Sequence, residues 1–197
     1  MQKKVFMGID QSYTSCGVVL INEQKEVLNC YRITSSKTDD IYQRAQTITN
    51  TVSSLIQKHD PYVIGLEGLA FSNFGNATRD LAGLQFCLVQ RIRYYHNHHY
   101  GPVIVAPKEL KKYAFKGNAT KDNMVDKLPQ AVLDLFKEHN FKKTTGLYDV
   151  TDAYWIACYA QDKHRPDQTS SLYFVFDSLV DPKHFTVEQI RQAVLDL

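Results

Sequence analysis

The N-terminus lacks the features of a targeting segment. Its apolar stretch, from Val5 to Ile9, is too short for a signal peptide or for a membrane span, which needs about 20 apolar residues. The cysteines lack a pairing pattern: none forms the C-x-x-C arrangement of zinc sites, and they are scattered at Cys16, Cys30, Cys87 and Cys158. We therefore expect buried free thiols and a soluble protein of the cytoplasm, with no membrane partner.

An excess of charge of one sign is also lacking. The net charge is only +2, so the overall balance does not by itself indicate a polyanionic partner. The distribution is uneven, however, because basic residues predominate between residues 79 and 121: Arg79, Arg91, Arg93, Lys108, Lys111, Lys112, Lys116 and Lys121. This basic segment favours binding to a phosphate backbone, with solvated helix faces as the alternative.

Internal repeats and low-complexity segments are absent. With 197 residues, of which 44% are hydrophobic, the chain can bury one substantial core, whereas two full domains would be cramped. Apolar periodicity stops at the polar stretch 163–168. We expect one domain over residues 1–162. Residues 163–197 are expected to form an appendage packed on that domain, with a strand near 171–177 and a helix near 186–195.

The order of apolar patterns predicts an α/β fold with a mixed five-stranded sheet flanked by helices. Strands are expected at 4–9, 16–22, 26–34, 62–68 and 102–107. Helices are expected at about 39–59, 76–99, 108–113, 121–139 and 150–160. The first three strands have short links and are therefore expected to be antiparallel. On the helix at 76–99, Leu81, Leu84, Leu88 and Ile92 share a face that belongs either to the core or to a dimer seam.

Four acidic residues stand at informative positions. Asp10 and Glu67 each end an apolar strand, and Asp149 and Asp152 have the spacing that puts two side chains on one face of a helix. Each has a simpler interpretation on its own, since Asp10 could belong to a turn, Asp149 could cap a helix and Asp152 could complement its dipole. Glu67, between Leu66 and Gly68, has no such role. Only the combination is specific.

A cluster of these acids would repel itself without cations. Carboxylate oxygens suit Mg²⁺ or Mn²⁺, which prefer octahedral oxygen coordination and bind phosphate oxygens as well. Two such ions can activate a water and stabilise the leaving oxygen in an attack on a phosphodiester. The acids therefore predict nuclease chemistry, provided that the strands of Asp10 and Glu67 are neighbours in the sheet.

These residues resemble a known family. The stretches "GIDQSYTSCGVVL", "VIGLEGLAF" and "DVTDAYWIACYA" are similar to the first strand, the strand of the catalytic Glu and the closing Asp-x-x-Asp-Ala helix of RuvC-type Holliday-junction resolvases, in the RNase H-like (retroviral integrase) superfamily. The resemblance covers about residues 4–161. It departs from the family at Gln11-Ser12, where Pro-Gly is usual, and the tail after Asp162 has no counterpart, which suits a divergent phage-like member.

The resemblance implies a function and a set of site residues. It implies a homodimer that cuts opposed strands of a four-way DNA junction, with two Mg²⁺ ions per active site, replaceable by Mn²⁺, and nicks with 5′-phosphate and 3′-hydroxyl ends. Asp10, Glu67, Asp149 and Asp152 would bind the metal, and Lys121 would act near the scissile phosphate. The expected DNA-binding residues are Phe71, Phe74, Asn76, Arg79, Lys108, Lys111, Lys112, Lys116 and Lys121. Such an enzyme would work at the nucleoid or in the cytoplasm of an infected host cell.

Other functions stay open at this point. An actin-like or sugar-kinase-like ATPase also opens with an Asp and a hairpin, but a second glycine-rich phosphate loop is not visible in the sequence. Another RNase H-like nuclease, acting on branched DNA or on RNA–DNA hybrid, would share the same acids, and an inactive DNA-binding scaffold would not need all of them. The histidines His96, His98 and His99 lack a further ligand at zinc spacing, which favours a DNA or dimer contact.

Overall fold

The computed structural model describes residues 4–69, 76–96, 101–115 and 120–164. Its sheet has five strands: β1 (Phe6–Asp10), β2 (Cys16–Ile21), β3 (Val27–Ile33), β4 (Val63–Glu67) and β5 (Val103–Val105). The strand order is β3-β2-β1-β4-β5, with β1 to β3 antiparallel and with β4 parallel to both β1 and β5. The predicted mixed sheet is therefore confirmed, and β1 and β4 are neighbours.

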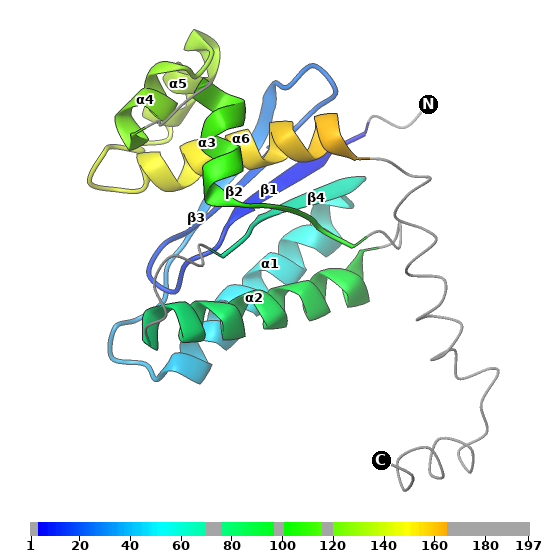
Figure 1. Cartoon of the computed structure of the whole chain (residues 1–197), viewed down its shortest axis with the longest axis vertical. Helices are drawn as coiled ribbons and strands as arrows, with labels where there is room; N and C mark the ends of the chain where they lie inside the picture. Colours follow the sequence, from blue (N-terminus) through cyan, green and yellow to red (C-terminus); the bar gives the residue numbers. More distant parts are fainter. Residues whose placement is uncertain (1–3, 70–75, 97–100, 116–119, 165–197) are drawn as a thin grey trace, which may run out of the picture. The chain divides into compact units, whose positions relative to one another are not determined.

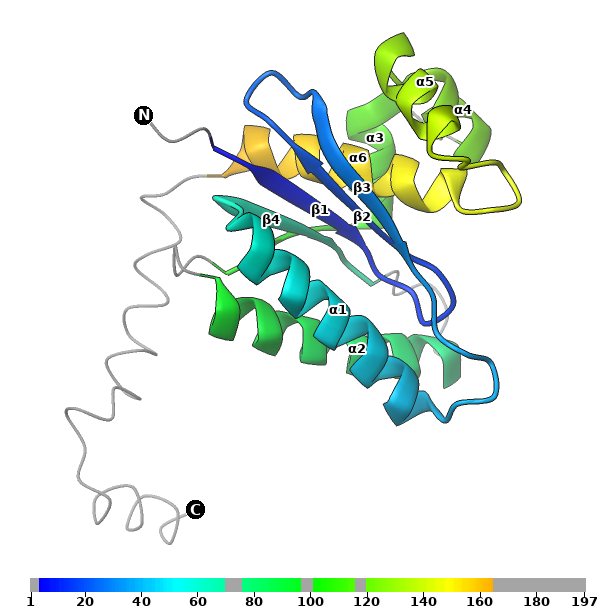
Figure 2. The ribbon, with the colours of Figure 1, turned by 180° about the vertical axis from the view of Figure 1, so that it is seen from behind.

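The helices form a layer on each side of the sheet. Figures 1 and 2 show α1 (Ile41–His59) and α2 (Asn76–Tyr95) covering one face and α6 (Leu147–Lys163) crossing the other. The smaller helices α3 (Pro107–Phe115), α4 (Lys121–Asp126) and α5 (Gln130–Glu138) lie on the side of α6. Asp40 begins α1 as the N-cap of a capping box with Gln43, which explains why the helix starts there.

The pleat of the strands decides which side chains face which layer. Met7 and Ile9 of β1 belong to the core under α1 and α2, and Phe6 belongs to the core under α6. Since successive strand residues point to opposite faces, Asp10 shares the α6 face with Phe6. In β4, Val63 packs in the α6 core, so Glu67 faces the same way. Both strand-end acids therefore point toward the layer that contains α6.

Three expected elements differ from the structure. The helix predicted at 121–139 is two helices, α4 and α5, because Pro129 precedes α5 and lacks the N–H that a continuous helix needs. The helix predicted at 150–160 begins earlier, at Leu147, and its N-cap is Gly146, so Asp149 is not a cap. The strand predicted at 102–107 is only Val103–Val105, since Pro107 already begins α3.

The remaining predictions about packing have mixed outcomes. Leu84, Leu88 and Ile92 are fully buried in the core, and Leu81 packs against them, so this face of α2 is not a dimer seam. All four cysteines are free, but the expectation of burial holds only for Cys16 and Cys158, since Cys30 is half-buried and Cys87 is exposed on α2. Within the described residues, no helix combines the length and the apolar character that crossing a membrane requires. The appendage expected at 163–197 lies, after His164, outside the described residues.

Candidate active site

Asp10 and Glu67 lie together at one edge of the sheet. The parallel pairing of β1 with β4 sets Ile9 opposite Leu66, so the two strands end side by side. Asp10 is 8% exposed, and its carboxyl group shares a hydrogen bond with the carboxyl group of Glu67. Two carboxyl groups in such contact need a proton or a cation between them.

Close packing of α6 on the sheet brings the other two acids to this edge. A Cβ on Gly8 of β1 would lie 2.0 Å from the Ala153 carbonyl oxygen, and a Cβ on Gly17 of β2 would lie 2.2 Å from that of Asp149. Only glycine lets the helix backbone approach the strands so closely. The first turns of α6, with Asp149 and Asp152, therefore lie directly beside the ends of β1 and β4.

The electrostatics confirm that the acids are near one another. Burial, and after it the charges of Glu67 and Asp152, raise the pKa of Asp10 well above its usual range. Burial also raises the pKa of Glu67, and burial followed by the charge of Glu67 raises the pKa of Asp152 to about 7. These shifts mean that the site resists holding several negative charges at once, which is the condition that a bound cation relieves.

Asp149 is held by residues that the sequence analysis did not single out. The Ser15 hydroxyl donates a hydrogen bond to Oδ2 of Asp149 and accepts one of 2.6 Å from Nε of Arg32. The Arg32 Nε also lies 3.8 Å from Oδ2 of Asp149. This chain of contacts joins β3, the loop after β1 and the first turn of α6, and it fixes the direction of the carboxylate.

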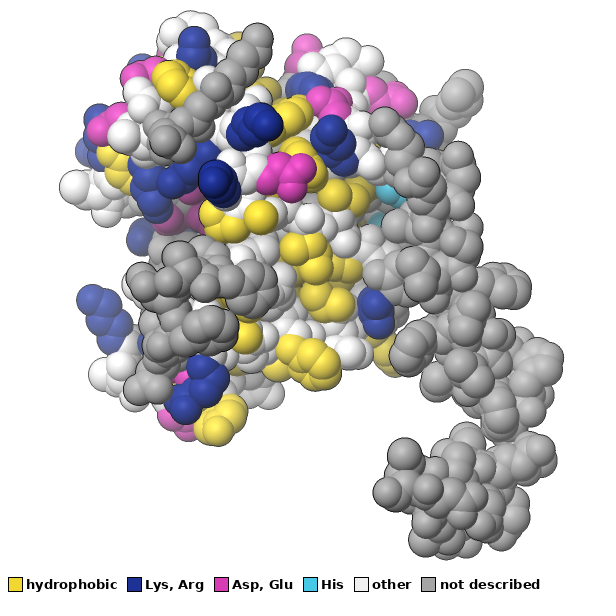
Figure 3. Space-filling view, viewed as in Figure 1, with side chains coloured by type: hydrophobic (Ala, Val, Ile, Leu, Met, Phe, Trp, Pro, Cys, Tyr) yellow, Lys and Arg dark blue, Asp and Glu magenta, His cyan; other side chains and the backbone are white. Residues whose placement is uncertain are grey.

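Two lysines face the acid cluster. Lys111 of α3 and Lys121, the first residue of α4, are close enough for their charges to act against the raised pKa values of Glu67 and Asp152. Figure 3 shows Lys and Arg side chains gathered over the part of this face formed by α3, α4 and α6. Lys111 was expected only as a DNA contact, so its closeness to the acids is new. The spacing of residues on α3 could not reveal which face of that helix the acids meet.

The other predicted DNA-binding residues fall into three groups. Lys108 and Lys112 line a separate surface groove with Tyr159 and Lys163, on another side of α3 from Lys111. Arg79 is exposed near the start of α2 and pairs with Asp80, whose carbonyl oxygen accepts a 3.0 Å hydrogen bond from Tyr13 in the loop after β1. Asn76 is the first residue of α2. Phe71, Phe74 and Lys116 lie outside the described residues.

The acids fit a divalent cation by the chemistry of their donors. They supply only carboxylate oxygens, the ligands that hard cations prefer, and the contact between Asp10 and Glu67 now needs a proton that a cation would replace. Across the described ranges, no group of three or more Asp, Glu, His or Cys side chains has an arrangement that could hold a metal ion, so the fit rests on the type of donor and not on a preformed site. His96 lies apart from the acids, with Nε2 at 2.7 Å from the Pro61 carbonyl oxygen.

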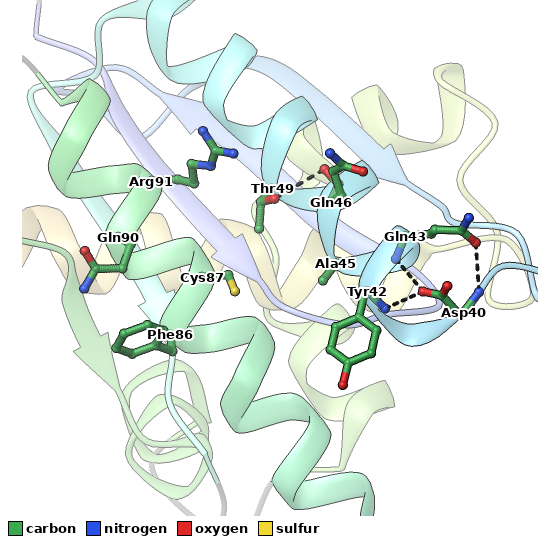
Figure 4. A pocket seen from close by; sticks show the side chains of 10 residues that line it. All are labelled: Asp40, Tyr42, Gln43, Ala45, Gln46, Thr49, Phe86, Cys87, Gln90 and Arg91. Atoms are coloured by element: carbon green, nitrogen blue, oxygen red, sulfur yellow. Dashed lines mark hydrogen bonds between the residues drawn. The ribbon is translucent and has the colours of Figure 1, made fainter.

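Another surface hollow lies away from the acids, between α1 and α2. Figure 4 shows its lining, which includes Tyr42, Phe86, Cys87 and Arg91. Asp40 at its rim accepts hydrogen bonds from the backbone N–H groups of Tyr42 and Gln43, as a helix cap does. The hollow therefore lacks the acid cluster on which a nuclease reaction would depend.

A comparison with protein families gives a match that includes the four acids. Residues 6–158 match the family described as crossover junction endodeoxyribonuclease RuvC. The chain belongs to the RuvC family. The matched range contains all four acids, Asp10, Glu67, Asp149 and Asp152. This RuvC-family chain is therefore a crossover junction endodeoxyribonuclease, an enzyme of Holliday-junction resolution, and the family's nucleases depend on metal ions.

Solved structures agree with this fold. A structure of Thermus thermophilus RuvC in complex with a Holliday junction substrate is 17% identical over 81% of this chain and 96% of that one, with a TM-score of 0.60. A second Thermus thermophilus RuvC structure is 16% identical over 78% of this chain and 90% of the other, with a TM-score of 0.56. No curated protein sequence matches the chain significantly. The predicted RNase H-like fold of this RuvC-family chain is confirmed.

Proposed function

We propose that this RuvC-family chain binds four-way DNA junctions and cuts them by paired symmetric nicks, leaving 5′-phosphate and 3′-hydroxyl ends. The observation that carries this proposal is the meeting of acids from β1, β4 and α6 at one sheet edge, with Asp10 and Glu67 in direct contact. Asp10, Glu67, Asp149 and Asp152 would hold two Mg²⁺ ions, or Mn²⁺ in their place. When bound, such ions lower the pKa of an attacking water and stabilise charge on the leaving oxygen.

The protein's own groups have separate tasks in this reaction. The four carboxylates would hold the ions that bind the scissile phosphate, and the Ser15–Arg32 pair would keep Asp149 oriented. Lys111 and Lys121 would neutralise negative charge that develops on the phosphate. Lys108, Lys112 and Arg79 would contact the backbone of the DNA arms.

Paired nicks need two active sites, so we propose a homodimer. The buried leucines of α2 are used in the core, but Phe86 and Tyr94 of the same helix are 66% and 80% exposed. Tyr42 on α1 is 81% exposed. Exposed aromatic side chains of this kind supply apolar area that association would cover. A stable monomer in light scattering that still makes paired nicks would contradict this part.

The central experiment compares substrates and one ligand variant. Wild type and Asp10→Asn are incubated with a synthetic four-way junction, a linear duplex and an RNA–DNA hybrid, each with and without Mg²⁺. We expect junction cleavage only by wild type with the cation, and a loss of at least about 100-fold for Asp10→Asn, because the site then lacks a charged ligand. Equal cutting by the variant would refute the metal assignment, and preferred cutting of the hybrid would refute the substrate.

The lysines can be tested with a matched control, because Lys111 and Lys112 are neighbours on α3 and only Lys111 faces the acids. Lys111→Ala and Lys121→Ala should lower the cleavage rate at saturating junction by about 10- to 100-fold, since both charges reach the acids. Lys112→Ala should leave that rate unchanged and reduce the salt dependence of binding by about one counterion, as expected for a backbone contact. Equal losses of this rate in all three variants would contradict a special role for the two lysines that face the acids.

The location follows from the substrate. A nuclease of recombination acts where junctions form, so we propose the cytoplasm, at the nucleoid or in an infected host cell. Fractionation of cells that carry a tagged chain, before and after DNase treatment, would test it. Release of the chain from the DNA fraction by DNase is the expected result.

A further inference from the structure

Gln11 follows Asp10 directly and is almost completely buried, with 4% of its surface exposed. Its side-chain Nε2 donates a 2.7 Å hydrogen bond to the backbone carbonyl oxygen of Glu67, 56 positions away in the sequence. A carbonyl oxygen can only accept, which assigns the nitrogen of the amide to this side. The contact therefore connects the residue after Asp10 to the backbone of Glu67, the other acid of the pair.

The contact lies where the backbone pairing of the two strands stops. The register of β1 with β4 runs from Phe6–Val63 to Ile9–Leu66, whereas the register of β1 with β2, on the other side, continues to Asp10–Gly17. Glu67 is paired on its other side with Val105 of β5. The Gln11 side chain thus replaces the missing step of the β1–β4 ladder at the level of the two acids.

The side-chain oxygen of Gln11 is unfavourable for stability. Among the described residues, its Oε1 is buried without a hydrogen-bond partner. A buried polar atom without a partner destabilises the folded state, so an apolar side chain of the same length would suit a purely structural role at least as well. The glutamine is therefore better explained by what its N–H group holds than by packing.

We propose that Gln11 is a positioning residue for the nuclease reaction. It fixes the backbone of Glu67 against the end of β1, and so sets the separation between the Glu67 and Asp10 carboxylates. A displacement of about 1 Å in a catalytic group can lower the rate about 100-fold, so the loss of a single hydrogen bond at this place should lower the cleavage rate strongly. The inference rests on the proposed function, because it concerns the same acids.

The chain contains a matched control for this contact. Gln161 near the end of α6 also donates from Nε2 to a backbone carbonyl oxygen, that of Glu23, at 2.8 Å, and its Oε1 is also buried without a partner. It lies about 18 Å along α6 from Asp149, given a rise of about 1.5 Å per residue. The two glutamines make the same kind of bond, and only Gln11 makes it beside the acids.

The experiment compares Gln11→Met, Gln11→Glu and Gln161→Met. Methionine keeps the length and removes the donor, while glutamate keeps an oxygen and turns the donor into an acceptor. Four quantities are measured: the melting temperature, the dissociation constant for a four-way junction, the single-turnover cleavage rate, and the Mg²⁺ concentration that gives half of the thermal stabilisation by Mg²⁺. The last does not depend on cleavage.

Both Gln11 variants should cut about 10- to 100-fold more slowly, with junction binding changed less than about threefold. Gln11→Met, which adds no charge, should also need more Mg²⁺ for half-maximal stabilisation. Gln161→Met should keep the wild-type rate and Mg²⁺ midpoint, whatever its melting temperature. A wild-type rate in either Gln11 variant, a wild-type midpoint in Gln11→Met, or the same losses in Gln161→Met, would overturn the proposal.

The two levels of the hypothesis can fail separately. If wild type cuts a hybrid or a branched duplex but no four-way junction, the proposed substrate fails, and the Gln11 variants are then compared on the substrate that is cut. If wild type cuts nothing, the Mg²⁺ midpoint still reports whether Gln11 positions the acids. An unchanged midpoint in that case would overturn the role of Gln11.

Discussion

The two faces of the central sheet are packed in different ways. Under α1 and α2, large aliphatic side chains fill the space, with Ile9, Ile56 and Leu88 all buried in one core. Under α6, Gly8 and Gly17 bring the strand backbone against the backbone of the helix. Side-chain contacts on the α1 and α2 face contribute to stability, whereas backbone contacts on the α6 face fix the position of that helix.

This difference explains where a nuclease site can be built. A helix that is separated from the sheet by a layer of side chains can shift slightly when a residue is substituted, because the neighbouring side chains repack. A helix that rests on backbone atoms has no such freedom, and any displacement moves Asp149 and Asp152 relative to Asp10 and Glu67. Substitutions on the α6 face should therefore lower mainly the cleavage rate, and substitutions on the α1 and α2 face should lower mainly the free energy of unfolding.

The largest effect is expected from filling the space under α6. Gly17→Ala would place a Cβ 2.2 Å from the Asp149 carbonyl oxygen, so the first turn of α6 must move. We expect junction cleavage to fall by about 100-fold or more, together with some loss of stability. Gly83→Ala on α2 is the control, since a Cβ there meets no atom within 4 Å, and it should retain the wild-type rate. Near-normal cleavage by Gly17→Ala would remove the proposed difference between the faces.

The opposite behaviour is expected on the α1 and α2 face. Leu88→Ala leaves a cavity in the core and should lower the free energy of unfolding by about 2–5 kcal/mol, measured by urea denaturation. The cleavage rate of the folded protein, measured well below its melting temperature, should stay close to wild type. A rate that falls while the protein remains folded would show that this face also positions the acids.

The acid cluster itself should reduce stability when no cation is present. Burial raises the pKa of Asp152 to about 7, whereas the pKa in the unfolded state is near 4. Ionisation of Asp152 therefore lowers the free energy of unfolding. This loss is absent below about pH 4 and develops as the pH rises from about 4 to 7. In EDTA, Asp152→Asn should therefore match wild type at pH 4 and exceed it at pH 8 by roughly 2–4 kcal/mol in unfolding free energy, while losing cleavage. No gain at pH 8 would contradict the burial of this charge.

The smallest effect is expected from the contact that orients Asp149. Ser15→Ala removes the hydroxyl between Arg32 and Asp149, and the single-turnover rate should fall about tenfold, with junction binding unchanged. Ser54→Ala is a suitable control, because the Ser54 hydroxyl donates only to the Asn50 carbonyl oxygen on the exposed side of α1. Equal rates for both variants would mean that Asp149 keeps its direction without the serine.

Several elements could be predicted because their signals are local. Short continuous apolar runs placed β1, β2 and β4 within one or two residues of their true bounds, and Asp10 and Glu67 were recognised because a charge at the end of a buried strand is unusual. The helix at 121–139 was wrong because its apolar spacing continues across Pro129, where the backbone cannot.

The partners of individual side chains could not be predicted. Lys111 and Lys112 are adjacent in sequence, yet one faces the acids and the other lines a groove, because successive residues on a helix point about 100° apart. Gln11, Ser15 and Arg32 carry no sequence signal beyond polarity, and Gln11 had been noted only for standing where Pro-Gly is usual.

By itself, the sequence determined the strand-end acids, the Asp149–Asp152 pair and the basic segment beside them, since each depends on residue type and short-range spacing. The tertiary structure decided the rest: that β1 and β4 are parallel neighbours, that α6 lies on Gly8 and Gly17, and that Gln11 donates to the Glu67 backbone and Ser15 to Asp149. These contacts join positions 56 and 134 residues apart in the chain. No local periodicity encodes such pairings, because they arise only when the faces of separate elements are packed together.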